Sequence, residues 1–138
     1  LQNDPNDIPR IYNLYIKRYE YKLIAGIRSK RKDSFAKKLA SKIANLVRMI
    51  YLKDSCKDTG CSLKIFEKKI FLNFEYFDGI HRFIPSLFEG YGYSVKYIPV
   101  NHRKRIHGIS KYNNLRRLFK TIPDMFKVKK MIKQNNKN

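Results

Sequence analysis

Apolar residues recur at intervals of three and four along residues 34–52, which places them on one face of a helix. The basic residues Lys42 and Arg48 fall largely off that stripe. Such a stripe usually packs against a core, so we expect a helix here whose apolar face is buried. The stripe consists of Phe35, Leu39, Ile43, Leu46, Val47 and Ile50.

Three stretches have the pattern of β-strands. Residues 21–27 form an apolar run that ends in Gly-Ile-Arg, as expected of a buried strand that opens onto a site at its end. Residues 61–66 and 93–100 alternate between apolar and polar positions.

Further helices are expected on both sides of these strands. Pro5 suits a first helical turn that Asn3 or Asp4 can cap. Pro85 interrupts or starts a later helix, and Pro123 kinks or divides the last one. The expected helical segments are residues 8–15, 67–74, 80–91 and 114–132. Strands that alternate with helices predict an α/β fold, although three strands are too few for a complete doubly wound sheet.

The composition adds a strong positive charge to this picture. The 138 residues carry a formal net charge of +20, which points to an anionic partner such as nucleic acid, an acidic lipid surface or a phosphorylated substrate. A hydrophobic content of 43% excludes a disordered polycation. Two cysteines and three histidines are too few for a disulfide framework or a zinc site. No apolar run is long enough to span a membrane.

The loop at residues 100–112 (VNHRKRIHGISKY) concentrates groups that bind phosphate. It combines four Lys or Arg residues with two His, and Gly108 lets the backbone turn where a Cβ would obstruct. A solvated basic loop or a nucleic-acid contact explains the same composition, so both readings stay open at this point.

Three other clusters could carry chemistry. Asp58 lies in a Gly-containing turn, where it could act as a general base, hold a sugar hydroxyl or merely cap the turn. His81 and Arg82 follow a capping Asp78, and they could face a ligand or be surface residues. Arg28 begins a basic cluster at a strand end, where open α/β sheets bind ligands, although such a charge run is more often solvated.

These segments follow one another in the order of a known family. LQNDP and DIP precede a strand ending in G-x-R and a helix with S-x-x-x-N. Then come DTGC-x-LK-x-F, FDG-x-HRF-x-P and a strand that runs into VNHR-x-R-x-x-G-x-SKY. This order resembles the family 2 glycosyltransferases, in particular the polyprenyl-phosphate branch of dolichol-phosphate mannosyltransferase-like enzymes. The resemblance covers nearly all of residues 1–126.

The resemblance implies a GT-A fold, the α/β fold of nucleotide-diphospho-sugar transferases, without its N-terminal nucleotide-binding half. Residues 1–113 would form the C-terminal part of the catalytic domain, and residues 114–138 a basic amphipathic helix with a polar tail. The family binds Mg²⁺ or Mn²⁺ through an Asp-x-Asp motif, which we expect upstream of Leu1, with Gln2 beside the metal. The chain on its own is therefore expected to be inactive.

The resemblance also implies roles for individual residues. Asp58 would be the base or the acid that orients the acceptor, and Ser41 would approach the acceptor phosphate. We assign His81 and Arg82 to the acceptor phosphate as well. The residues expected to bind the donor diphosphate are Arg28, Arg103, Arg105, Ser110 and Lys111.

The implied reaction moves a hexose, most naturally mannose or glucose, from a nucleotide-diphosphate sugar to a polyprenyl or dolichyl phosphate. The acceptor phosphate is already an anion, so it needs placement by cations more than deprotonation. A lipid acceptor requires an enzyme at a membrane surface, and we expect peripheral association with the cytoplasmic face. Residues 114–132 could lie in an anionic interface or simply pack on the domain.

Two other functions remain as alternatives. A basic nucleic-acid-binding protein would use Lys and Arg beside stacking Tyr and Phe, but no known module of that kind matches, so we expect no nucleic-acid partner. A non-catalytic interaction domain derived from a transferase would keep the fold without the reaction.

Overall fold

The computed structural model describes residues 3–29, 35–101, 103 and 114–137. Its described strands form one sheet in the order β2-β1-β3. β1 runs antiparallel to β2 and parallel to β3. The bounds are Leu23–Arg28 for β1, Lys64–Phe66 for β2 and Val95–Val100 for β3. The predicted α/β class is confirmed, with a small mixed sheet.

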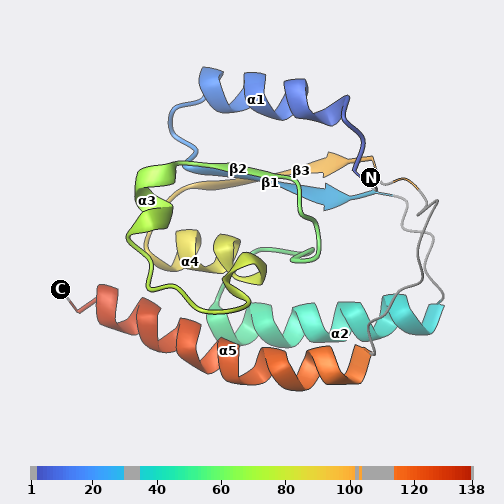
Figure 1. The fold of residues 1–138 in the computed structure, drawn as a ribbon, viewed down its shortest axis with the longest axis vertical. Helices are drawn as coiled ribbons and strands as arrows, with labels where there is room; N and C mark the ends of the chain where they lie inside the picture. Colours follow the sequence, from blue (N-terminus) through green and yellow to red (C-terminus); the bar gives the residue numbers. More distant parts are fainter. Residues whose placement is uncertain (1–2, 30–34, 102, 104–113, 138) are drawn as a thin grey trace.

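Helices cover both faces of this sheet (Figure 1). α1 (Asp7–Lys17) lies on one face. On the other face, α4 (Ile84–Gly90) lies beneath the strands, and α2 (Phe35–Leu52) and α5 (Asn114–Asn135) form an outer layer in contact with each other. The short helix α3 (Lys68–Leu72) and the 3-10 turn η1 (Ile80–Arg82) connect β2 to α4.

The apolar core is divided by the sheet, because successive side chains of a strand point to opposite faces. Leu23 of β1 belongs to the larger cluster, which contains Phe83, Leu87 and Phe88 and lies between the sheet and the outer helices. Ile24, the next residue, belongs to the smaller cluster beneath α1. Leu23 and Ile24 are both fully buried, so β1 contributes to the apolar core on both faces of the sheet.

α2 is turned opposite to the sequence prediction. Its described stripe residues, Leu39, Ile43, Leu46, Val47 and Ile50, are between 47% and 70% exposed. Arg48 is instead buried at 3% exposure, and Leu52 is buried beside it. The reason is that α4 already fills the space beneath the sheet with apolar side chains, while Arg48 finds hydrogen-bond partners inside. The expectation of a buried apolar stripe is therefore wrong.

α5 shares the core of the domain through one of its faces. Val128, Met131 and Ile132 are buried in the larger cluster. A Cβ on Gly90 would lie 2.4 Å from the Cδ1 atom of Ile132, so the glycine lets α4 approach α5 closely. The helix runs through Pro123 without being divided. The boundary that we predict after residue 113 lies at the edge of the described residues.

Among the described helices, none is long and apolar enough to cross a membrane.

Candidate functional site

The parallel strands β1 and β3 end at the same edge of the sheet. Arg28, the last residue of β1, is paired in register with Val100, the last residue of β3. Beyond this pair, the backbone N–H and the hydroxyl of Ser29 both donate to the Val100 carbonyl, at 3.0 and 2.9 Å. Two segments that the sequence marks as basic therefore leave the sheet from one place, the carboxyl edge, where open α/β sheets bind ligands.

Asp58 lies at this edge and binds Arg28 directly. Its two carboxylate oxygens accept hydrogen bonds from Nη2 and Nε of Arg28, at 2.7 and 2.8 Å, and Oδ2 also accepts from the Arg28 backbone N–H at 3.1 Å. Gly60 makes room for this arrangement, since a Cβ there would lie 2.5 Å from Nη2 of Arg28. The Asp-Thr-Gly turn is thus built to hold a guanidinium at the end of β1.

Asn3 and Asp4, near the start of the chain, also make contacts at the carboxyl edge. The Asp4 carboxylate accepts a hydrogen bond from Arg103 at 2.7 Å, which joins it to the loop that follows β3. The pKa of Asp4 is lowered, first by the Asn6 backbone N–H and further by Arg103. Asn3 donates to the Ser62 hydroxyl at 2.8 Å. Segments from four parts of the sequence therefore converge at the carboxyl edge.

Asp7 has a role that the sequence analysis missed. An acid in the first turn of a helix is favoured by the helix dipole, but the buried carboxylate of Asp7 also accepts a hydrogen bond from the Asn101 backbone N–H at 2.7 Å. It also accepts from Arg10 at 2.8 Å. Asp7 thereby ties the first turn of α1 to the exit of β3, and only the distant partner Asn101 could have revealed this.

A second guanidinium–carboxylate pair, Arg48 with Asp54, lies deeper in the molecule, and the sequence analysis did not predict it. Nη1 of Arg48 donates to the Asp54 carboxylate at 2.9 Å and to the Ser86 hydroxyl at 3.3 Å. Nη2 of Arg48 donates to the Cys56 carbonyl. The cluster joins α2, α4 and the loop that leads to Asp58. It therefore helps to set the position of that loop.

Buried groups of other kinds lie close to the Asp58 turn. Lys64 of β2 donates to the Cys61 carbonyl, and burial lowers the pKa of its ammonium. Burial raises the pKa of the Cys56 and Cys61 thiols, which favours inert, protonated thiols.

The other predicted site residues lie elsewhere or outside the described residues. Arg82 donates to Thr121 and Asp124 of α5, both at 2.8 Å, and so joins η1 to α5 rather than lying at the carboxyl edge. His81 is exposed on the same turn, and Ser41 is half-buried on α2. Their assignment to the acceptor phosphate stays a prediction. The positions outside the described residues are Gln2, Arg105, Ser110 and Lys111.

The described residues contain no group of three or more His, Cys, Asp or Glu that could hold a metal ion. These residues therefore do not by themselves fit the Mg²⁺ or Mn²⁺ that the motifs imply, and we derive no step through a metal.

The chain is similar in sequence to several curated sugar transferases. The dodecaprenyl-phosphate galacturonate synthase of Rhizobium johnstonii is 37% identical over 131 residues, which are 93% of this chain and 38% of that protein. An undecaprenyl-phosphate 4-deoxy-4-formamido-L-arabinose transferase of Pectobacterium carotovorum is 32% identical over 116 residues, 84% of this chain and 35% of that protein. The Pseudomonas aeruginosa protein of that name is 31% identical over 118 residues, 86% and 34% of the two chains.

The chain is homologous to the polyprenyl-phosphate sugar transferases, which are family 2 glycosyltransferases. The resemblance read from the motifs is thereby confirmed. The chain spans little more than a third of the length of these transferases. Their names specify galacturonate and 4-deoxy-4-formamido-L-arabinose, so a mannosyltransferase-like specificity stays a prediction. No family model matches the chain, and no solved structure matches it.

Proposed function

We propose that the protein to which this chain belongs transfers a sugar from a nucleotide-diphosphate sugar to a polyprenyl phosphate at a membrane surface. In this proposal the described α/β unit is the C-terminal part of a GT-A catalytic domain. The observation that carries the proposal is the convergence of Arg28, Asp58 and Arg103 at one sheet edge, in a chain homologous to polyprenyl-phosphate transferases.

The edge supports a reaction between two phosphate-bearing substrates. Departure of a nucleoside diphosphate leaves negative charge that nearby guanidinium groups can stabilise. Arg28 is held by Asp58 with both side chains largely buried, so its position is set before a substrate arrives. Arg103 pairs with Asp4 at the same edge but is 53% exposed. Such preorganised donors stabilise developing charge without the cost of reorienting them during the reaction.

This geometry favours an orienting role for Asp58 over a role as base. Both of its oxygens already accept hydrogen bonds from Arg28. A lipid phosphate is an anionic nucleophile, so the transfer does not require a strong proton acceptor. In our proposal Asp58 fixes Arg28, and Arg28 contacts a phosphate.

The remaining parts of the site are proposed from the family resemblance. Arg105, Ser110 and Lys111 would complete the contacts to the donor diphosphate, and Ser41 would approach the acceptor. A divalent cation, Mg²⁺ or Mn²⁺, would share the diphosphate charge through acidic ligands that precede Leu1, with Gln2 beside it. The sugar that we propose is a hexose, mannose or glucose, and the relatives' names add a hexuronate, galacturonate, and a pentose derivative, 4-deoxy-4-formamido-L-arabinose.

The reaction is tested with the full-length protein and a panel of labelled nucleotide sugars, measuring label transferred to polyprenyl phosphate. Arg28→Ala should reduce transfer on the order of 100-fold, because a misplaced phosphate loses its alignment. The matched control is Arg18→Ala, which removes an exposed arginine just after α1, outside the carboxyl edge. Failure of every nucleotide sugar to label the lipid, or equal losses in both variants, would refute the proposal.

The outward face of α2 supports the membrane part of the proposal. Five large apolar side chains of α2 are exposed, and Ile122 and Phe126 of the neighbouring α5 are exposed as well. An apolar surface of this kind marks an interaction site. A lipid surface fits it, because the relatives are named for polyprenyl-phosphate acceptors and exposed lysines such as Lys42 flank the apolar side chains. We propose peripheral association with the cytoplasmic face.

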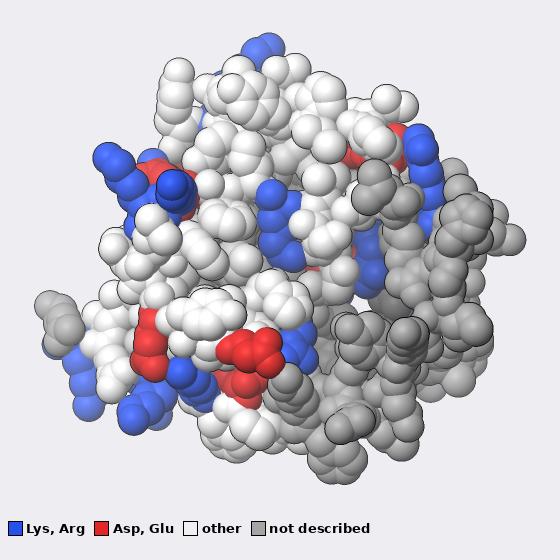
Figure 2. Space-filling view, in the orientation of Figure 1, with Lys and Arg blue, Asp and Glu red and all other residues white. Residues whose placement is uncertain are grey.

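On the face shown in Figure 2, the described Lys and Arg side chains lie at separate places, several of them beside Asp or Glu. A groove that tracks a nucleic-acid backbone is continuous and basic, and the described residues of this face form no such groove.

Vesicle sedimentation with the full-length protein tests the apolar face. Ile43→Asp and Val47→Asp together should weaken binding to neutral vesicles on the order of tenfold for each residue, because each side chain loses apolar burial. The control replaces Ile8 and Tyr12, which are similarly exposed on α1 across the sheet. Unchanged vesicle binding in the α2 variant would mean that another part of the protein covers this face.

A further inference from the structure

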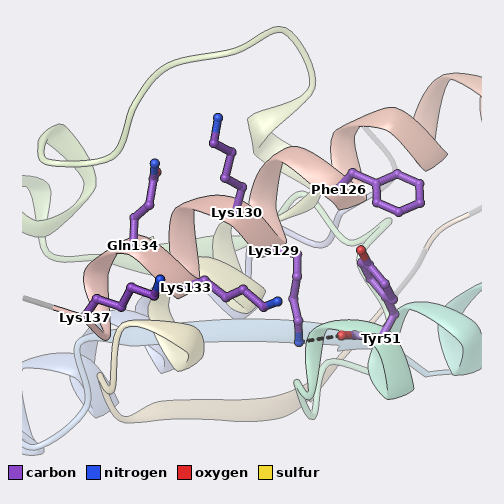
Figure 3. A pocket seen from close by; sticks show the side chains of 7 residues that line it. All are labelled: Tyr51, Phe126, Lys129, Lys130, Lys133, Gln134 and Lys137. Carbon is purple, nitrogen blue, oxygen red and sulfur yellow. Dashed lines mark hydrogen bonds between the residues drawn. The ribbon is translucent and has the colours of Figure 1, made fainter.

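A second cation-rich feature lies away from the carboxyl edge, between the last turn of α2 and the second half of α5. It is a cavity of about 390 Å³ (Figure 3). Two aromatic residues and four lysines form most of its lining: Tyr51, Phe126, Lys129, Lys130, Lys133 and Lys137.

The cavity follows from the way α5 packs. The buried residues Val128, Met131 and Ile132 fix one face of the helix against the domain. The lining residues of α5 recur at intervals of three and four, so they occupy the face of the helix next to the buried one. Lys129 and Lys133 point toward α2, whereas Lys130 and Gln134 point to the outer side (Figure 3).

One lysine of the set is held in place. Lys129 donates to the Tyr51 carbonyl at 2.8 Å, and its ammonium lies 5.6 Å from the centre of the Tyr51 ring. The Tyr51 carbonyl belongs to the last turn of α2, whose carbonyls lack partners within the helix. Lys129 therefore caps α2 and brings a fixed positive charge to the cavity.

The lining residues of the cavity carry only positive charges, since they include no Asp or Glu. One acid lies nearby: Glu75 pairs with Lys127, which is not a lining residue, at 2.9 Å, and the pKa of Glu75 is lowered first by Lys127 and further by Lys130. Lys130, Lys133 and Lys137 are exposed along the rim. Bringing an anion among these ammonium groups would offset their mutual repulsion.

The cavity is apolar at one end. The Tyr51 and Phe126 rings meet edge to face with centroids 5.5 Å apart, and Phe126 is 60% exposed. Ile50, the neighbour of Tyr51 in α2, continues this end into the exposed apolar face of α2. A ligand suited to the whole feature has an anionic group beside an apolar body, as a phospholipid has at its headgroup.

We propose that this cavity binds the phosphate of an anionic lipid headgroup, at a site separate from the Arg28–Asp58 edge. The proposal rests on the membrane association proposed above and adds a preference for anionic lipids. Lys129 and the rim lysines contact the phosphate, while Phe126 lies against the acyl region.

The test compares full-length protein on vesicles of phosphatidylcholine alone and of phosphatidylcholine with phosphatidylglycerol. Replacing Lys130, Lys133 and Lys137 by Gln should weaken binding to the anionic vesicles about fivefold per lysine, equivalent to ~1 kcal/mol each, and leave neutral vesicles unaffected. The control replaces three exposed lysines elsewhere, Lys17 of α1 and Lys68 and Lys69 of α3.

Each outcome separates this site from the membrane proposal. If the wild-type protein binds neither the neutral nor the anionic vesicles, membrane association itself is overturned. Wild-type binding that is weakened equally in the cavity variant and the control, or equally on both vesicles, overturns the headgroup site alone. Equal affinity for soluble glycerol phosphate in calorimetry would assign the cavity to a free phosphate. Tighter binding to single-stranded nucleic acid than to anionic vesicles at the same salt would overturn the lipid assignment.

Discussion

Two guanidinium–carboxylate pairs use acids only four positions apart in one loop, Asp54 and Asp58. The Arg48–Asp54 side chains are 4% and 1% exposed, and Ser86 and a loop carbonyl add further hydrogen bonds inside the protein. The Arg28–Asp58 side chains are 16% and 7% exposed and lie at the carboxyl edge of the sheet. The same kind of pair therefore joins elements inside the protein in one place, and in our proposal it faces the substrates in the other.

The comparison shows that pairing alone does not identify a functional charge. A buried pair is strongly destabilised when one partner is lost, because the other is left charged away from water. A pair at a sheet edge tolerates that loss better, since water can reach the remaining group. Breaking the Arg48–Asp54 pair should therefore lower stability more, and breaking the Arg28–Asp58 pair should lower activity more.

The largest effect on stability is expected at the inner pair. Asp54→Ala should lower the free energy of unfolding by about 3–5 kcal/mol, because Arg48 stays charged and buried without its carboxylate. Urea denaturation followed by circular dichroism measures it. Replacing both residues, Arg48→Met with Asp54→Leu, should recover most of that loss. A double variant no more stable than Asp54→Ala would show that the pair itself, rather than the orphaned charge, supports the loop.

At the outer pair we expect a smaller loss of stability and a larger loss of activity. Asp58→Asn should cost about 1–3 kcal/mol of unfolding free energy and should reduce sugar transfer on the order of 100-fold. If Asp58 acts by holding Arg28, then Arg28→Ala with Asp58→Asn should be no slower than the worse single variant. Multiplicative losses in the double variant would assign the two residues independent roles.

A third pair, Arg82–Asp124, tests the assignment of Arg82 to the acceptor. It joins η1 to α5 at 2.8 Å, with both side chains 17% exposed. Gly79 has a φ of 103°, and a Cβ there would lie 2.4 Å from Nη2 of Arg82. Arg82→Ala and Asp124→Ala should each lower the free energy of unfolding by about 1–2 kcal/mol. If Arg82 binds the acceptor phosphate, as the resemblance implies, Arg82→Ala should also reduce sugar transfer while Asp124→Ala should not. Equal transfer in the two variants would contradict that assignment.

The smallest effect concerns Lys64, a half-buried cation that pairs with no carboxylate among the described residues. Burial lowers the pKa of Lys64 below 10.5 in the folded state. The protonated lysine therefore costs stability at neutral pH, and this cost disappears as pH rises through the folded pKa toward 10.5. Lys64→Met should be at least as stable as wild type at pH 7, with the difference shrinking by pH 10 in urea denaturation. A difference that grows with pH would contradict the sign.

Much of the fold was predictable because its signals are local. Apolar runs and alternation located the three strands of the described residues, and Pro85 marked the start of α4, where it lies in the first turn. The turn containing Asp58 and the strand end at Arg28 were both recognised as candidate sites. Their direct contact was not predicted, because 30 positions separate them and no local pattern encodes that approach.

The orientation of α2 shows the limit most clearly. Helical spacing establishes that an apolar stripe exists on one face, but it does not specify what the stripe faces. The inward side of α2 depends on partners elsewhere in the chain, Asp54 and Ser86, which accept hydrogen bonds from Nη1 of Arg48. The exposure of the apolar face of α2, which supports the proposed membrane contact, could therefore be recognised only from the three-dimensional structure.

By itself, the sequence determined the α/β class, the positions of the strands and the family, because these depend on periodicity and on motifs in order. Tertiary structure decided which charges meet at the carboxyl edge, that the Arg48–Asp54 pair is buried, and that the apolar face of α2 is exposed. The physical reason is that a buried charge requires a partner at hydrogen-bond distance, and the folded chain draws such partners from remote positions.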